Sequence, residues 1–92
     1  MEYKVLIVED DPMVAMINEQ YVCKNPQFVV AASCRNGQEA LDFLDANNVD
    51  LIVLDVFMPY MDGIEALKTI REKKIAAEVI MVTAANDSAT IE

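Results

Sequence analysis

The stretch LIVLD at residues 51–55 is the most hydrophobic piece of the chain, and an aspartate ends it. A continuous apolar run of this length is typical of a strand that is buried on both faces, as in a parallel sheet. The run YKVLIV at residues 3–8 has a similar character and stops at the three acids of residues 9–11. Two such runs, each ending in an acid, predict a buried parallel sheet with a polar edge.

Strand and helix patterns alternate outward from these two runs. Further strands are predicted at residues 27–33 and 78–83. Helices are predicted from Pro12 to about Lys24, from Gly37 to about Asn47, from Ile64 to beyond Arg71, and from residue 86 or 87 onward. Proline is tolerated in a first helical turn, which suits Pro12. The alternating order predicts an α/β, doubly wound parallel sheet with right-handed crossovers and helices on both faces.

Composition restricts the class of protein. Ninety-two residues, of which 54% are hydrophobic, suffice for one domain with a real core. No apolar run approaches the roughly 20 residues of a membrane helix, and residues 1–4 lack the basic character of a secretory signal, so we expect a cytoplasmic protein. Cys23 and Cys34 are then expected to be reduced and mostly buried.

Charge points to a class of partner. The balance of 7 basic and 16 acidic residues gives a net charge of −9, which repels nucleic-acid phosphates and favours a divalent cation or a basic partner surface. The chain contains no histidine, so any histidine chemistry must come from a partner. We therefore expect no direct binding to nucleic acid.

Polar residues end three of the four predicted strands: the acids of residues 9–11, Asp55 and Thr83. Ligands of open parallel sheets bind beyond the carboxyl ends of the strands. Crowded carboxylates repel one another unless a cation lies between them, and their hard oxygens suit Mg²⁺. A carboxylate is also a competent nucleophile for a phosphoryl group. The pattern makes Asp55 a candidate phosphoryl acceptor, with Thr83 and the N–H groups that follow Asp55 and Thr83 as donors to phosphate oxygens.

Three motifs together resemble the receiver domain of bacterial two-component response regulators: VEDDP at residues 8–12, LDVFMP at 54–59 with Asp62-Gly63, and VTA at 82–84. The resemblance runs through the whole chain in order. It implies a flavodoxin-like receiver fold with the strand order 2-1-3-4. It also implies a domain that is not an enzyme in the usual sense, because it catalyses only its own phosphorylation and dephosphorylation, with the phosphohistidine of a sensor histidine kinase as donor.

The resemblance assigns a role to each residue of the predicted metal site. Asp55 is the phosphoacceptor, and Asp10 and Asp55 bind Mg²⁺ directly. Glu9 acts on the metal through water, and the backbone carbonyl of Phe57 supplies the remaining protein ligand. Asp11 follows as a supporting loop acid.

The phosphoryl group has its own implied contacts. Thr83 is the switch hydroxyl that moves toward it, and the Ala84 N–H helps to hold it. The backbone at Val56 and Phe57 completes the phosphate-binding set.

The resemblance also implies a part that residues 1–92 do not contain. The family carries a lysine and a switch aromatic on a fifth strand, and neither has a counterpart here. We expect residues 1–92 to be a C-terminally incomplete receiver domain with weakened phosphoryl binding, and an output domain to lie outside this chain. The apolar run VIMV at residues 79–82 would form a sheet edge, and a hypothesis is that copies of the chain form a homo-oligomer through it.

A finer resemblance and two alternatives remain. DDPMVA at residues 10–15 and TAAND at 83–87 resemble the regulators paired with citrate and C4-dicarboxylate sensor kinases, which implies a DNA-binding output domain that regulates transcription. One alternative is a degenerate receiver that acts only as a binding module. The other is a haloacid-dehalogenase-like phosphohydrolase, but that family places its nucleophile on the first strand with a second acid two residues later, whereas position 57 is phenylalanine.

Overall fold

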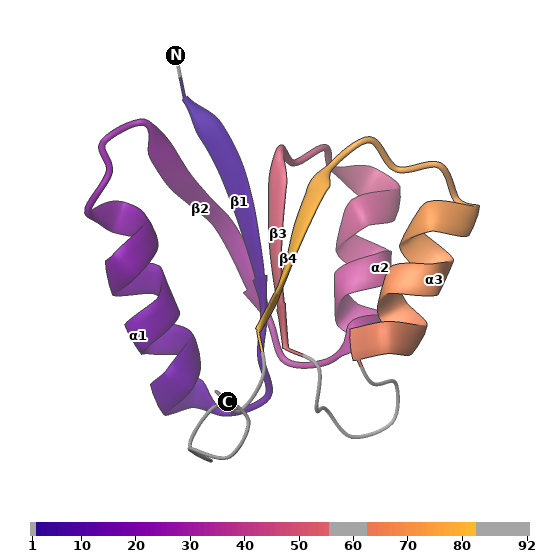
Figure 1. The fold of residues 1–92 in the computed structure, drawn as a ribbon, viewed down its shortest axis with the longest axis horizontal. Helices are drawn as coiled ribbons and strands as arrows, with labels where there is room; N and C mark the ends of the chain where they lie inside the picture. The colour runs from indigo at the N-terminus through magenta and orange to yellow at the C-terminus, as the bar shows by residue number, and fades with distance from the viewer. Residues whose placement is uncertain (1, 56–62, 83–92) are drawn as a thin grey trace, which may run out of the picture.

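The computed structural model describes residues 2–55 and 63–82, which form a parallel sheet between two layers of helices (Figure 1). The elements in chain order are β1 (Tyr3–Val8), α1 (Pro12–Cys23), β2 (Phe28–Cys34), α2 (Gly37–Ala46), β3 (Leu51–Asp55), α3 (Gly63–Glu72) and β4 (Glu78–Val82). The sheet has the order β2-β1-β3-β4, and every neighbouring pair is parallel. The predicted fold class and strand order are therefore confirmed.

The helices divide between the two faces of the sheet. α1 lies on one face, whereas α2 and α3 lie side by side on the other (Figure 1). Among the described helices, none has the length and hydrophobicity that crossing a membrane requires. All the strands point the same way, so their carboxyl ends meet at one edge of the sheet.

Two apolar clusters hold the layers together, and β1 contributes to both. Leu6 and Val8 belong to a large cluster with residues of β3, α2 and α3, and Val5 and Ile7 belong to a small one with Ala15 of α1. These four β1 side chains are at most 1% exposed. Full burial of such a side chain contributes about 1.5–3 kcal/mol, so β1 anchors both halves of the fold.

β2 contains a bulge that changes which of its side chains face α1. Val5 pairs with Val30, but the next β1 residue, Leu6, pairs with Ala32, so the extra residue is Ala31. Beyond this shift Ser33 lies opposite Ile7, on the face that α1 covers. Bulges re-aim side chains near functional sites, and after this one Ser33 lines a cleft together with residues of α1.

One expectation about burial and one about the bounds of a strand need correction. Cys23 is exposed whereas Cys34 is buried, and both are free thiols, so the prediction of two mostly buried cysteines is wrong for Cys23. Cys23 is the last residue of α1. Ala15 is the one residue that this helix buries, so its last turn is open to solvent. The predicted β2 range of 27–33 is one residue early at each end, because the bulge carries the strand on to Cys34. The helix predicted after residue 86 lies outside the described residues.

Candidate functional site

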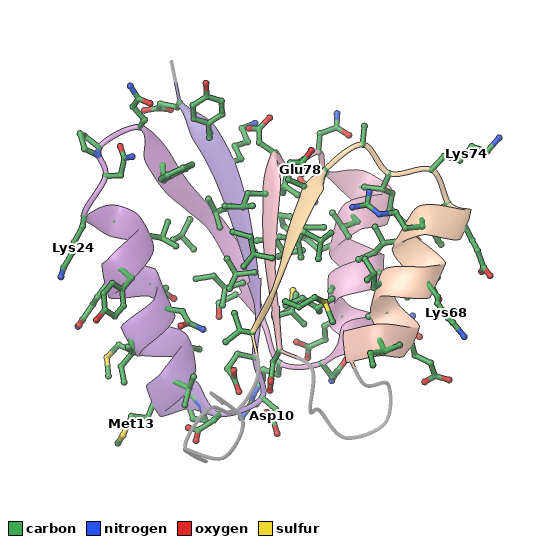
Figure 2. The ribbon with its side chains drawn as sticks, viewed as in Figure 1. Asp10, Met13, Lys24, Lys68, Lys74 and Glu78 are labelled. Atoms are coloured by element: carbon green, nitrogen blue, oxygen red, sulfur yellow. The ribbon has the colours of Figure 1, made fainter. Side chains whose placement is uncertain are left out.

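Three carboxylates meet where β1 and β3 end. Val8 and Leu54 are paired neighbours in the sheet, so the residues that follow them, Glu9 and Asp55, lie next to each other. One carboxylate oxygen from each of Glu9, Asp10 and Asp55 lies within 4.8 Å of the others. Figure 2 places Asp10 at this edge of the sheet, just before α1. Glu9 and Asp55 are only 6% and 5% exposed, whereas Asp10 is open to solvent.

Short-range hydrogen bonds fix the turn that carries these acids. The Glu9 N–H donates to the carbonyl of Cys34 at 2.9 Å, and the Glu9 carboxylate accepts the Asp11 N–H at 3.2 Å. Asp11 in turn accepts the Met13 N–H at 2.9 Å and caps α1, with Pro12 in the first turn. An aspartate directly before a helix-starting proline is a typical N-cap, so the Asp-Pro pair was the signal for this role of Asp11.

Burial and charge act together on Glu9. Burial first, and then the neighbouring acids Asp55 and Asp10, raise the pKa of Glu9 from its usual 4.5 to about 7, against the opposing effect of the Asp11 N–H. A cation placed among these carboxylates would reverse the repulsion. Their hard oxygen atoms match Mg²⁺, which typically takes one or two protein carboxylates and keeps several waters. The donor set is thus suited to a magnesium ion.

The remaining predicted site residues cannot be placed in this cluster. Val56, Phe57, Thr83 and Ala84 lie outside the described residues, so their roles stay predictions. Val82, which precedes Thr83, pairs with Asp55 in the sheet.

An apolar helix surface begins beside the carboxylates. On α1 the side chains of Met13, Met16, Ile17 and Tyr21, which we call the α1 face, are between 45% and 67% exposed. Figure 2 shows Met13 at the end of α1 that lies nearest Asp10. Exposed apolar patches are typical of interaction surfaces, which makes the α1 face a candidate contact surface.

The comparisons with known proteins agree on the family to which the chain is similar. Residues 5–92 match the response regulator receiver domain. The chain is 50% identical over 92 residues to the transcriptional regulatory protein CitT of Halalkalibacterium halodurans, and 42% identical over 90 residues to the probable C4-dicarboxylate response regulator DctR of Bacillus subtilis. Each match covers 98% of this chain and 40% of the relative. A solved structure of the MaeR response regulator bound to beryllium trifluoride matches with a TM-score of 0.84 and 34% identity, over 99% of this chain and 74% of that one.

Proposed function

Because the chain belongs to the response regulator receiver domain family, we propose that Asp55 accepts a phosphoryl group in a reaction that depends on Mg²⁺. The grouping of Glu9, Asp10 and Asp55 at one edge of the sheet carries this proposal. Receiver domains of transcriptional response regulators are signalling modules, so the reaction serves as a switch rather than as turnover of a metabolite.

The chemistry balances with a carboxylate as nucleophile. A carboxylate oxygen of Asp55 forms a bond to phosphorus as the bond from phosphorus to the donor breaks, and the electron pair leaves with the donor. A bound Mg²⁺ would neutralise charge on the carboxylates and on the incoming phosphoryl oxygens. Asp10 and Asp55 would hold it directly, Glu9 would hold it through water, and the Phe57 carbonyl would complete the protein ligands.

The phosphoryl group needs further donors once it is bound. In this proposal the Thr83 hydroxyl and the N–H groups of Val56, Phe57 and Ala84 hold its oxygens. As the family implies, the donor is a phosphohistidine of a sensor histidine kinase, and this histidine must belong to a partner because the chain has none. Met16 of the α1 face lines a cleft together with Glu9 and Asp10, so a kinase that brings its histidine to Asp55 would lie against this face.

The setting of the domain follows from the relatives and remains part of the proposal. The chain spans 40% of the length of the curated relatives CitT and DctR, and we propose that an output domain, DNA-binding in the parent protein, receives the signal. The chain would act in the cytoplasm.

β4 supports a proposal about self-association. Among the described strands it is one of the two outer ones, and its Ile80 side chain is 50% exposed. Among the strands that the structure describes, none pairs with the outer edge of β4, and a sheet edge can pair with a second copy of the chain. Sedimentation should show dimers or larger species as the concentration rises, and a monomer throughout would contradict the pairing.

Acetyl phosphate with Mg²⁺ tests the acceptor. Intact-mass measurement should show one adduct of about 80 Da, the mass of a phosphoryl group, that depends on the metal and disappears in Asp55→Asn. Asp42→Asn removes an exposed carboxylate on α2 and should keep the adduct, which makes it the matched control. A folded protein without any adduct would favour the degenerate receiver, and turnover of phosphate esters without an adduct would favour the phosphohydrolase.

A further inference from the structure

We propose that Arg35 binds the phosphoryl group of the incoming donor and so determines how well a donor is used. The inference rests on the proposed function, because it concerns the delivery of the phosphoryl group to Asp55. Arg35 directly follows β2, which β1 separates from β3 in the sheet.

Arg35 lies in a cleft that opens beside the carboxylates. The cleft has a volume of about 360 Å³, and its lining includes Glu9, Asp10, Ser33 and Arg35 together with residues of α1. Ligand sites generally begin at about 300 Å³, so the cleft is large enough for a small acyl phosphate or for a phosphorylated imidazole ring. Ser33 lies there because the bulge at Ala31 turns it toward α1.

Backbone contacts hold Arg35 close to the site. Its predecessor Cys34 accepts the N–H of Glu9 at 2.9 Å, which joins the end of β2 to the end of β1. The N–H of Arg35 donates to the Glu39 carboxylate at 2.8 Å, and the Glu39 N–H donates to the Asn36 side chain at 2.8 Å. The backbone of Arg35 is therefore held from both sides, and the residue itself is exposed.

The charge of Arg35 is available to a ligand. Within residues 2–55 and 63–82, the guanidinium of Arg35 forms no ion pair, whereas Lys73 pairs with Asp45. The other charged residues that line the cleft are the acids Glu9, Asp10 and Glu19. A phosphoryl anion that approaches this edge meets repulsion, and a guanidinium offers it two parallel hydrogen bonds as well as positive charge.

This position predicts two effects of opposite sign when the charge is removed. Arg35→Gln should slow phosphorylation at low donor concentration about tenfold, the lower end of what a charge-assisted hydrogen bond contributes. The same substitution should tighten Mg²⁺ binding by about twofold, because it removes a positive charge near a cation site in high dielectric. A residue with a merely structural role would weaken both or change neither.

The experiment uses two donors that share the phosphoryl group and differ in the leaving group. Rates of adduct formation are measured at saturating Mg²⁺ with acetyl phosphate and with phosphoimidazole, which stands in for phosphohistidine, and Mg²⁺ affinity is measured by calorimetry. We expect Arg35→Gln to lose rate with both donors and Arg35→Lys to recover most of it. Lys24→Gln, which removes the same charge at the far end of α1 (Figure 2), should behave as the wild type.

Results that differ from these expectations overturn either the role of Arg35 or the proposed function. Equal rates for wild type and Arg35→Gln would overturn the inference while leaving Asp55 as the acceptor. A loss with only one donor would also overturn it, because the residue would then recognise the leaving group. A wild-type protein that gains no adduct from either donor would instead overturn the proposed function itself.

Discussion

The carboxyl groups of Glu9 and Asp55 lie next to each other at the ends of neighbouring parallel strands, and both are almost fully buried. Burial and, to a smaller extent, the adjacent Asp55 raise the pKa of Glu9 to about 7. Two acids in this position cannot both be ionised without a free-energy cost unless a cation joins them. The stability of the metal-free protein therefore depends on the protonation of the site.

The metal-free protein should lose stability as the pH rises from about 5 to 8. Unfolded Glu9 releases its proton near its usual pKa of 4.5, and folded Glu9 releases it only near 7, so the folded state binds more protons between these values. The free energy of unfolding should fall by up to about 3 kcal/mol across this range from this group alone. Urea unfolding at both ends of the range measures it. Glu9→Gln should remove this part of the slope, and an unchanged slope would contradict the assignment.

Mg²⁺ should stabilise the folded protein through the same carboxylates. At tenfold excess over its dissociation constant a ligand adds about 1.4 kcal/mol, which corresponds to a rise of about 5 °C or more in the unfolding midpoint of a domain of this size. Asp10→Asn should abolish the rise, and Asp42→Asn should keep it. Calorimetry in MgCl₂ against NaCl of equal ionic strength gives the comparison. A rise that persists in Asp10→Asn would place the metal elsewhere.

The stability of the first turn of α2 should depend on the side chain of Asn36. Its side chain accepts the Glu39 N–H at 2.8 Å and satisfies a group that the helix itself leaves without a partner. Asn36→Ala should lower the free energy of unfolding by about 1 kcal/mol, whereas Asn36→Asp keeps the acceptor and should cost little. Chemical unfolding of the three proteins tests this, and equal stability of Asn36→Ala and wild type would rule the cap out as a stabilising contact.

The α1 face should matter for phosphotransfer and not for stability. Met13→Ser and Ile17→Ser change exposed side chains, so each should alter the free energy of unfolding by no more than about 0.5 kcal/mol. Ile70→Ala, in the large cluster, should cost about 2–5 kcal/mol. Phosphorylation by acetyl phosphate should be unchanged in the two serine variants. Transfer from a cognate kinase should slow in them, and unimpaired transfer would exclude this surface from kinase binding.

Much of the fold follows from local sequence. Runs such as YKVLIV and LIVLD predict their strands because full burial demands apolar residues at every position. The buried side of α1 was not predictable in the same way. Met13 and Ile17 are as apolar as Val14 and Val22. The periodicity therefore predicts a helix but does not indicate which of its sides packs against the sheet.

The geometry of the site was predictable only in part. Parallel strands place Glu9 beside Asp55, and this could be expected from the order of the elements. The bulge at Ala31 could not, because it depends on how β2 pairs with β1 across a long stretch of chain. The nearness of Arg35 to the acids follows from that pairing, and no local motif indicates it.

The unequal size of the two apolar clusters has a consequence for how the protein opens. α1 is held to the sheet by the small cluster, in which Ala15 is its one buried side chain, whereas α2 and α3 share the large one. Backbone amides of α1 should therefore exchange with deuterium through a local opening that leaves the other face intact. Asp10 lies between β1 and α1, so a bound metal would slow this exchange. The exchange rates of the α1 amides would then report whether the metal site is occupied.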